Sequence, residues 1–466
     1  MRYVSTRGRA PELGFCDVLL AGLANDGGLY VPQHWPKLPD LSAAADYPTM
    51  AAAVMAPFIG DDMPASDFEA MCRDAYSTFR HDAVVPLVQI GTNEWLLELF
   101  HGPTLAFKDV ALQLVGRLFD YVLAKRGQRI TIVAATSGDT GSAALDAVKD
   151  CANVDIVVLY PNGRVSEVQR RQMTTVVSPS VHTVAVEGTF DDCQDLVKAM
   201  FNDAAFRERM NLSAVNSINW ARVMAQTVYY VTTCRALGAT ADAGLTFCVP
   251  TGNFGNVFSG WIAREMGAPI DDFIVASNSN DILTRFINEG DMSTLPVVHT
   301  VSPSMDIQVS SNFERLLFEI NGRDGGQTAE QLAAFRHSGR LSLEPDQRAQ
   351  WIGSSFRAAR FDDAETLAEI RRVYQRSGQL LDPHTATGTA AVRCLRAGHD
   401  GRPVVTLSTA HPAKFPDAVV RATGVLPSLP PHLADLLDRV ERTNLVPNDL
   451  AAVEAFVESA VAVGHG

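Results

Sequence analysis

The sequence predicts an α/β protein whose mainly parallel sheets carry helices on both faces. Three observations predict this fold class. From residue 95 onward, short apolar runs, often β-branched, alternate with segments of helical period, which is typical of parallel strands joined by crossover helices. Loops rich in Gly, Ser and Thr follow several of these runs. The length of 466 residues is enough for two or three domains.

The composition is that of an acidic globular protein. Hydrophobic residues make up 47% of the chain and charged residues 20%, and the net charge is −14. A negative chain is a poor partner for nucleic acid or an anionic membrane, and no apolar run reaches the roughly 18 residues of a membrane span. The seven cysteines are widely spaced without a CxxC pair. This spacing argues against disulfide or zinc sites and favours a cytoplasmic location.

Residues 1–92 are expected to form an N-terminal domain. A turn at residues 25–28 (NDGG) divides it, and residues 66–79 carry apolar side chains at helical spacing. We expect a helix there with Ser66 as its N-cap, because a serine hydroxyl accepts a hydrogen bond from the free N–H groups of a first turn.

Two α/β domains are expected to follow, a smaller one over residues 93–235 and a larger one over residues 236–466. The expected strands are 95–100, 129–134, 155–159, 245–249 and 403–407, and the expected helices are 109–123, 142–148, 191–201 and 257–266. Residues 310–380 are charged and helical in pattern, so we expect a helical insertion there.

Lys108 stands between an apolar loop and an apolar helix, in the segment HGPTLAFKD at residues 101–109. Desolvation at such a place disfavours the ammonium form and lowers the pKa of the lysine, which favours Schiff-base formation. A single lysine is far more often a surface residue with an extended apolar stem. Both interpretations stay open on this segment alone.

Two glycine-containing loops each join an expected strand to an expected helix. Residues 136–142 (TSGDTGS) and 250–256 (PTGNFGN) place small residues at a helix N-terminus, where backbone N–H groups bind a carboxylate or a phosphate. An ordinary strand–helix turn explains the first loop equally well. Neither loop has the G-x-G-x-x-G or Walker pattern, so a phosphate that is not part of a nucleotide is favoured.

Two further segments follow expected strands. Residues 408–415 (STAHPAKF) offer a hydroxyl that could meet a ring nitrogen, and Arg164 places a cation after the strand at 155–159. An ordinary loop would also explain the first of these segments, and a surface arginine would also explain the second. The sequence contains no H-E-x-x-H or G-x-S-x-G motif, which argues against a zinc protease or a serine hydrolase.

Taken together, these segments resemble the threonine synthase family, whose members are fold-type II pyridoxal-phosphate enzymes with a tryptophan synthase β-like fold. The matching stretches run in family order over nearly the whole chain. They are residues 3–8 (YVSTRG), 26–31, 101–109, 135–143, 163–166, 172–174, 216–220 (NSINW), 252–256, 382–388 and 409–415. The lysine segment and the GNFGN loop are the most specific of them.

The resemblance implies a role for each matching residue. Lys108 would be the catalytic lysine that carries pyridoxal 5'-phosphate, and Thr409 would meet the pyridine nitrogen. The cofactor phosphate would be bound by Gly252, Asn253, Phe254, Gly255 and Asn256. The substrate would be bound by Thr136, Ser137, Asp139, Thr140 and Arg164, with Lys414 as a second candidate cation for its phosphate. Asn256 departs from many relatives, which have Asp there.

The implied reaction converts O-phospho-L-homoserine and water into L-threonine and phosphate, the last step of threonine biosynthesis. The implied partner is this small molecule, with no nucleic acid or membrane, and the chain is expected to be a monomer or a homodimer. Two alternatives stay open. One is another fold-type II lyase, such as a threonine or serine dehydratase or a phospholyase, and the other is a non-catalytic protein that binds a phosphate ligand.

Overall fold

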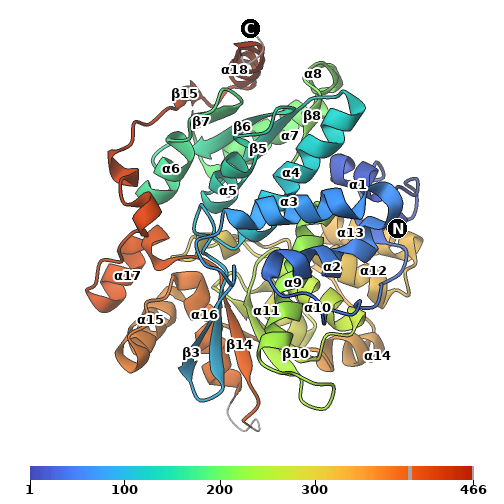
Figure 1. Cartoon of the computed structure of the whole chain (residues 1–466), viewed down its shortest axis with the longest axis vertical. Helices are drawn as coiled ribbons and strands as arrows, with labels where there is room; N and C mark the ends of the chain where they lie inside the picture. The colour runs from blue at the N-terminus through green and yellow to red at the C-terminus, as the bar shows by residue number, and fades with distance from the viewer. Residues whose placement is uncertain (397–400, 464–466) are drawn as a thin grey trace.

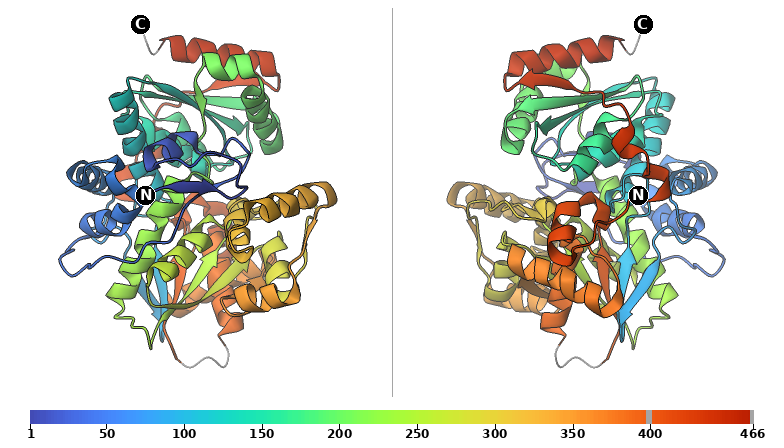
Figure 2. Two further views of the ribbon diagram at one scale, coloured as in Figure 1. Left: turned by 90° about the vertical axis from the view of Figure 1, so that its right-hand side faces the viewer. Right: turned by 90° about the vertical axis from the view of Figure 1, so that its left-hand side faces the viewer.

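The computed structural model describes residues 1–396 and 401–463 and contains two main sheets, stacked along the long axis of the molecule (Figures 1 and 2). The larger sheet has six strands in the order β13-β10-β9-β14-β4-β3. All neighbours are parallel except β3, which pairs antiparallel with β4. The strands are β3 (Leu87–Gly91), β4 (Glu94–Glu98), β9 (Leu245–Pro250), β10 (Ile270–Ser277), β13 (Phe356–Arg360) and β14 (Val404–Ser408).

The smaller sheet has five strands, all parallel to their neighbours, in the order β15-β7-β6-β5-β8. Its strands are β5 (Ile130–Ala135), β6 (Val154–Pro161), β7 (Val181–Glu187), β8 (Leu212–Ser213) and β15 (Asn444–Pro447). Every residue of β6 is buried, as the apolar run at its centre predicts for a strand covered on both faces. All five strands expected from the sequence are present in the two sheets.

The helices that connect these strands are α4 (Lys108–Arg126), α5 (Asp139–Val148), α6 (Glu167–Thr174), α7 (Phe190–Asn202), α8 (Ala204–Arg209), α9 (Trp220–Ala236), α10 (Gly255–Met266), α11 (Ile282–Glu289), α12 (Phe313–Ile320), α13 (Gly325–Ser338), α14 (Pro345–Gln347), α15 (Asp363–Ser377), α16 (Pro383–Leu395), α17 (Pro416–Thr423) and α18 (Leu450–Val463). None of the described helices is long and apolar enough to cross a membrane.

Helices cover both faces of the larger sheet, as predicted. Phe247 and Val249 of β9 belong to one hydrophobic cluster with Val257 of α10. Cys248, between them, belongs to another with Ala390 and Ala391 of α16. Successive side chains of a strand point to opposite faces, so α10 and α16 cover the two sides of β9.

The N-terminal residues form a two-stranded ribbon, β1 (Tyr3–Ser5) and β2 (Tyr30–Pro32), with α1 (Phe15–Ala21), α2 (Tyr47–Ile59) and α3 (Ala65–Ser77). The prediction of Ser66 as an N-cap was wrong, because α3 begins one residue earlier and Pro64 takes the cap position without a side-chain hydrogen bond. Tyr3 fixes this segment to α9. Its hydroxyl donates to the carbonyl of Phe58 at 2.7 Å and accepts from the indole of Trp220 at 3.0 Å.

The two sheets do not follow the expected domain boundaries at residues 93 and 236. Strands β3 and β4 precede the smaller sheet in sequence but belong to the larger one, because β4 pairs with β14 in the register Leu97 to Leu407. After α17, the chain crosses back and adds β15 and α18 beside β7 (Figure 1). Glu441 holds this crossing segment to α6, since its carboxylate pairs with Arg170 at 2.9 Å.

The region expected as a helical insertion, residues 310–380, is only partly helical. It contains α12, α13 and α15, but also β13, which forms the edge of the larger sheet through the pairing of Phe356 with Phe273. It also contains β12 (Arg340–Leu341), which pairs antiparallel with β11 (Met292–Ser293), before the region in sequence. The insertion therefore contributes a strand to the sheet.

The C-terminal return to the smaller sheet leads to a stability prediction. Val453 of α18 is fully buried in a cluster with Val133 and Val157, whereas Leu445 of β15 is 59% exposed. We expect Val453→Ala to lower the free energy of unfolding by about 2 kcal/mol, because a buried cavity is left. The matched Leu445→Ala should change it by less than about 0.5 kcal/mol in urea titrations. Equal effects would show that α18 is not packed as described.

Candidate active site

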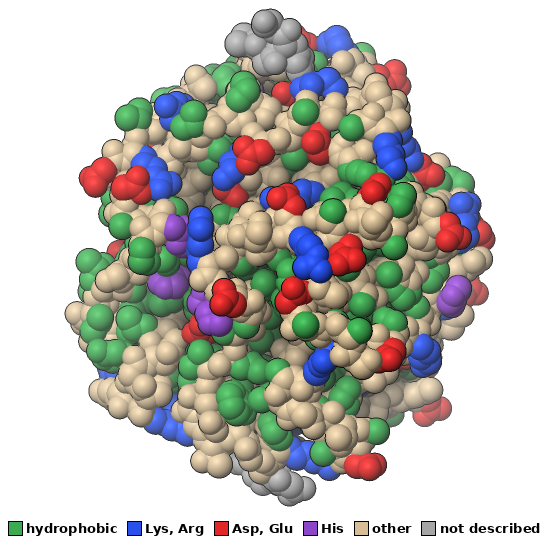
Figure 3. Space-filling view, viewed as in Figure 1, with side chains coloured by type: hydrophobic (Ala, Val, Ile, Leu, Met, Phe, Trp, Pro, Cys, Tyr) green, Lys and Arg blue, Asp and Glu red, His purple; other side chains and the backbone are tan. Residues whose placement is uncertain are grey.

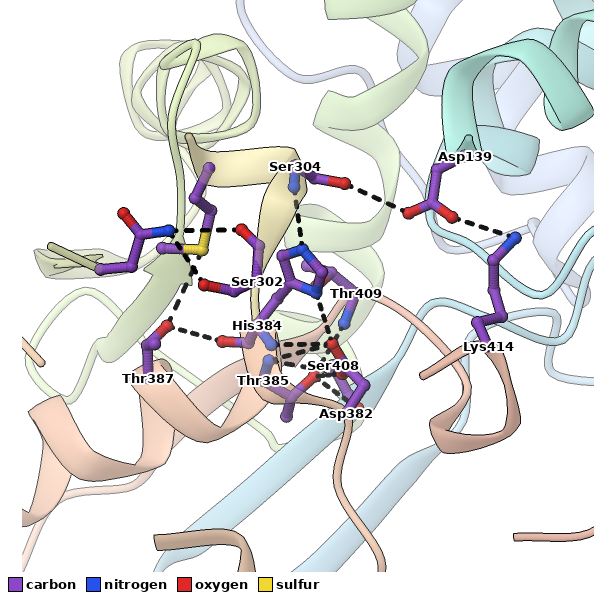
Figure 4. Close-up of polar contacts among 12 residues, drawn as sticks. Asp139, Ser302, Ser304, Asp382, His384, Thr385, Thr387, Ser408, Thr409 and Lys414 are labelled. Carbon is purple, nitrogen blue, oxygen red and sulfur yellow. Dashed lines mark hydrogen bonds and ion pairs between the residues drawn. The ribbon is translucent and has the colours of Figure 1, made fainter. Parts of the chain in front are cut away.

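The predicted loops meet where the carboxyl ends of the strands in the two sheets approach each other. Figure 4 shows Asp139 from α5, His384 and Thr385 from α16, and Thr409 and Lys414 from the loop after β14. Ligands of open α/β sheets bind at this end of parallel strands. The predicted site residues, with one exception described below, are brought together there.

Lys108 is the first residue of α4 and is 8% exposed. Its Nζ lies 3.1 Å from Oδ2 of Asp139 and 4.9 Å from the centre of the Phe107 ring. Burial lowers the pKa of Lys108, and the neighbouring carboxylate only partly opposes this effect. These contacts exclude a surface lysine with a free ammonium group.

The loop before Lys108 is fixed by the residue that follows it. The buried carboxyl of Asp109 accepts hydrogen bonds from the backbone N–H of Thr104 at 2.8 Å and from its hydroxyl at 2.6 Å. Burial raises the pKa of Asp109 to about 7. A Cβ added at Gly102 would lie 2.5 Å from Cβ of Asp109, so only glycine fits there. The loop therefore presents Lys108 from a rigid backbone.

Asp139 is the acceptor that joins several parts of the site. Its carboxylate accepts from Lys108, from Gln169 of α6 at 2.9 Å and from the hydroxyl of Ser304 at 3.4 Å, and it pairs with Lys414 at 3.1 Å. Burial alone would disfavour the charged form. The two lysines and His384 outweigh it and hold the pKa of Asp139 well below its usual range.

Lys414 is fully buried, and its close partners are all oxygen atoms of the protein. Its Nζ donates to the carbonyl of Thr104 at 2.6 Å and to Oε1 of Gln172 at 2.7 Å, in addition to the ion pair with Asp139. Its charge is therefore already paired within the protein. The structure therefore does not support Lys414 as the cation that binds a substrate phosphate.

The GNFGN loop opens α10 and leaves the first-turn N–H groups of that helix available. Phe254 takes the left-handed conformation (φ 62°) at the N-cap, and no side chain caps the helix. Residues 302–312, which we call the covering segment, lie across this loop. A Cβ on Gly252 would come within 3.0 Å of Ile307, and Ser310 donates to the carbonyl of Gly252 at 2.7 Å. An uncapped, closely covered helix N-terminus suits a small anion.

Asn256 completes this loop with a buried donor. Its side-chain oxygen accepts from the hydroxyl of Tyr229 at 2.5 Å and from that of Tyr230 at 2.8 Å. Its Nδ2 is buried and has no hydrogen-bond partner among the described residues. Asn256 thus places an additional N–H donor beside the loop.

Sequence reasoning missed Arg222, in the first turn of α9. It is 2% exposed, and within the described residues its side chain makes one hydrogen bond, a long one of 3.5 Å to the carbonyl of Val215, while its Nε has no partner. No ion pair joins it to an acidic side chain among the described residues, and burial lowers its pKa to about 10. Its charge also lowers the pKa of Lys108, which places it near that residue. The matching stretch NSINW ends two residues before it.

A buried cation without a counter-ion is costly unless an anion binds beside it. Arg222 also shares a face of α9 with Gln226 and Tyr229, at helical spacing. Gln226 donates to the carbonyl of Arg222 at 2.9 Å, and the Tyr229 hydroxyl, which donates to Asn256, lies 3.3 Å from Oε1 of Gln226. This series of contacts links Arg222 to the start of α10.

Thr409 lies directly beside the lysine loop. Its carbonyl accepts from the N–H of Phe107 at 2.8 Å, and its own N–H donates to the hydroxyl of Thr385 at 3.2 Å. Thr385 is fixed in turn by the buried carboxylate of Asp382, which also accepts from Nδ1 of His384 at 2.8 Å. The Thr409 hydroxyl makes no hydrogen bond within the described residues, so it is free for a ligand.

The remaining predicted substrate residues fall into three groups. The Thr136 hydroxyl accepts from the N–H groups of Gly138 at 3.0 Å and Gly141 at 2.9 Å, so it shapes the loop. Ser137 and Thr140 are half-buried at the start of α5. Arg164 is the exception mentioned above: it is exposed after an open turn at Gly163, and its charge acts on Asp192 of α7. No described contact joins Arg164 to the Lys108 cluster, which makes it a poor candidate for the site.

Family models match three consecutive parts of the chain. The model described as threonine synthase N terminus matches residues 2–76, the pyridoxal-phosphate dependent enzyme model matches residues 84–342, and the threonine synthase C-terminal model matches residues 385–457. In the described residues no cluster of His, Cys, Asp and Glu side chains could hold a metal ion.

Comparison with individual proteins also finds threonine synthases. A threonine synthase of Pseudomonas aeruginosa is 54% identical over 98% of both chains. The crystal structure of PLP-bound threonine synthase from Brucella melitensis superposes with a TM-score of 0.95 at 53% identity, covering 99% of both chains. Threonine synthase-like 2 of Rattus norvegicus is 37% identical over 94% of this chain and 92% of its own length.

The contact between Gly252 and the covering segment leads to a prediction about anion binding. In Gly252→Ala, the new Cβ would press on Ile307 and Met305, so the helix N-terminus should bind phosphate more weakly. We expect the stabilisation of ligand-stripped protein by inorganic phosphate, measured as a thermal shift, to be largely lost. Gly353→Ala is the control, since nothing lies within 4 Å of that position. An undiminished shift in Gly252→Ala would place phosphate elsewhere.

Proposed function

The chain belongs to the threonine synthase family of pyridoxal-phosphate enzymes, and from this premise we propose how its residues form L-threonine and phosphate from O-phospho-L-homoserine and water. The observation that carries the proposal is the buried Lys108, held 3.1 Å from Asp139 beside unpaired donors for a phosphate. A lysine of lowered pKa next to such donors suits amine chemistry on a phosphorylated ligand.

The donors of the site fit pyridoxal phosphate. The uncapped first turn of α10 and the free Nδ2 of Asn256 would hold its phosphate, and the free hydroxyl of Thr409 would meet its ring nitrogen. When bound, this group supplies the electron sink that stabilises negative charge next to the substrate amino group. Lys108 is the residue that would carry it.

Lys108 is also proposed to move protons. Its lowered pKa leaves more of the neutral amine near neutral pH, which is the form that can accept the proton from Cα of the substrate. Asp139 accepts a hydrogen bond from its Nζ and so orients the amine and stabilises it once it is charged. We propose that the same nitrogen also takes a proton from Cβ and returns protons at Cγ and Cα, because the product has a hydroxyl at Cβ and a methyl group at Cγ.

The substrate has two anionic groups, and the site offers a separate place for each. We propose that the α-carboxylate is bound by Ser137, Thr140 and the N-terminus of α5. The side chains of the two residues are half-buried and free of described hydrogen bonds. We propose Arg222 as the cation for the departing phosphate, in place of Arg164. A fixed buried cation stabilises negative charge that develops on a leaving group.

The partners follow from the substrate and from the surface. Acidic and basic side chains are interspersed over the face shown in Figure 3, and the seven cysteines are free. We propose that the chain acts on a small molecule as a cytoplasmic monomer or homodimer. Size-exclusion chromatography with light scattering measures the oligomeric state.

The substrate assignment predicts the products. Purified protein supplied with O-phospho-L-homoserine should release phosphate and L-threonine in equal amounts, as measured by phosphate assay and amino-acid analysis. Ammonia release from serine or threonine without L-threonine formation would favour a dehydratase. Phosphate release without L-threonine formation would favour a phospholyase.

The proposed role of Lys108 predicts the behaviour of Lys108→Ala. This variant should lose turnover by at least about four orders of magnitude, because the group that carries the cofactor and moves the proton is gone. Its circular dichroism and unfolding midpoint should stay close to those of the parent, since Lys108 contributes one hydrogen bond to the fold. Substantial residual turnover would contradict the assignment.

The proposed role of Arg222 predicts a loss that depends on the substrate phosphate. Arg222→Gln should lower kcat/KM for O-phospho-L-homoserine by roughly 100- to 1,000-fold, with cofactor affinity nearly unchanged. Arg264→Gln is the matched control, because Arg264 is also partly buried but donates to Ser355 at 3.0 Å. Loss of cofactor affinity with an unchanged KM would instead assign Arg222 to the cofactor phosphate.

A further inference from the structure

Two lysines share the Asp139 carboxylate, but they are held very differently. Lys108 makes one hydrogen bond, to Oδ2, and is 8% exposed. Lys414 lies against the other oxygen, Oδ1, at 3.1 Å, and is fully buried. Besides this ion pair, it donates hydrogen bonds to Thr104 and Gln172. One lysine is therefore able to leave the carboxylate, and the other is fixed.

The partners of Lys414 hold one another in place. Gln172 donates from Nε2 to the same Thr104 carbonyl at 3.0 Å, which closes a ring of contacts around the ammonium group. Thr104 is held from its other side by Asp109. Because these residues come from α6 and from the loop before α4, Lys414 joins the end of β14 to the smaller sheet.

The proposed function requires Lys108 to give up its ammonium charge in part of the cycle, because only the neutral amine can accept a proton from the substrate. Asp139 would then lose one of its two cations. A buried carboxylate without a cation tends to take up a proton. A protonated Asp139 could no longer accept from Lys108, Gln169 and Ser304 together, so the loop at the start of α5 would lose its arrangement.

Charged and polar groups face Asp139 from several elements. They are Lys108 from α4, Gln169 from α6, Ser304 from the covering segment, His384 from α16 and Lys414 from the turn after β14. Among the residues that these contacts describe, the two lysines are the nearest cations. Arg222 acts on Lys108 and has the substrate phosphate as its proposed partner.

From this arrangement we propose that Lys414 is a positioning residue whose ion pair keeps Asp139 charged and in place while Lys108 changes its own charge. The proposal rests on the proposed function, since it needs Lys108 to carry the cofactor. It gives a role to a buried lysine that the reaction itself does not use.

The test compares Lys414→Met with Lys414→Arg and with the control Lys149→Met, whose lysine pairs with Asp146 near the surface. The absorbance of each cofactor-loaded protein is recorded between pH 5 and 9, as is the unfolding midpoint. We expect Lys414→Met to gain a spectral transition below pH 7 that the parent lacks, because Asp139 now takes up a proton beside the bound cofactor. Lys414→Arg and Lys149→Met should keep the parent profile.

A double variant identifies the group that titrates. Adding Asp139→Asn to Lys414→Met should remove the new transition. A Lys414→Met spectrum with the parent's pH dependence, alone or with a lowered unfolding midpoint, would overturn the proposal and leave Lys414 a structural cross-link. If Lys414→Met does not retain cofactor, Lys414→Arg decides: parent-like retention supports a need for charge, and equal loss contradicts it. Because the readout is a spectrum, failure here is distinct from failure of the threonine assay.

Discussion

The site depends on one buried carboxylate, Asp139, that is held between two lysines. Such a group is stable only when cations and donors surround it, and the structure supplies these from several segments that are far apart in sequence. The same contacts determine where Lys108 lies and how far burial lowers its pKa. The arrangement around Asp139 thus turns a lysine at the start of a helix into a reactive amine.

A second constraint is the excess of donors over acceptors near the start of α10. Arg222, the free Nδ2 of Asn256 and the uncapped first turn of that helix all lack an anionic partner. In a folded protein such groups are costly unless a ligand satisfies them. Binding of phosphate groups by cofactor and substrate would therefore stabilise the folded chain as well as position the reaction.

Much of the fold could be predicted from local sequence, because most strands at the centre of a sheet are short apolar runs, and β5 and β9 are followed by glycine-containing loops. The pairing of β4 with β14 and of β15 with β7 could not, since it joins residues more than 250 positions apart. In β10, Asp271 and Asp272 precede the apolar residues and conceal the start of a strand. Arg222 was missed for a similar reason: its significance is the absence of a partner, which only packing reveals.

The central claim is that Lys108, and not the neighbouring Lys414, carries the cofactor. The direct measurement is reduction of the loaded protein with borohydride, followed by proteolysis and mass spectrometry to locate the phosphopyridoxyl group. The account predicts that the label is found on Lys108 alone, because Lys414 is fully buried and held by two hydrogen bonds and an ion pair. A label on Lys414, or no stable label at all, would contradict it.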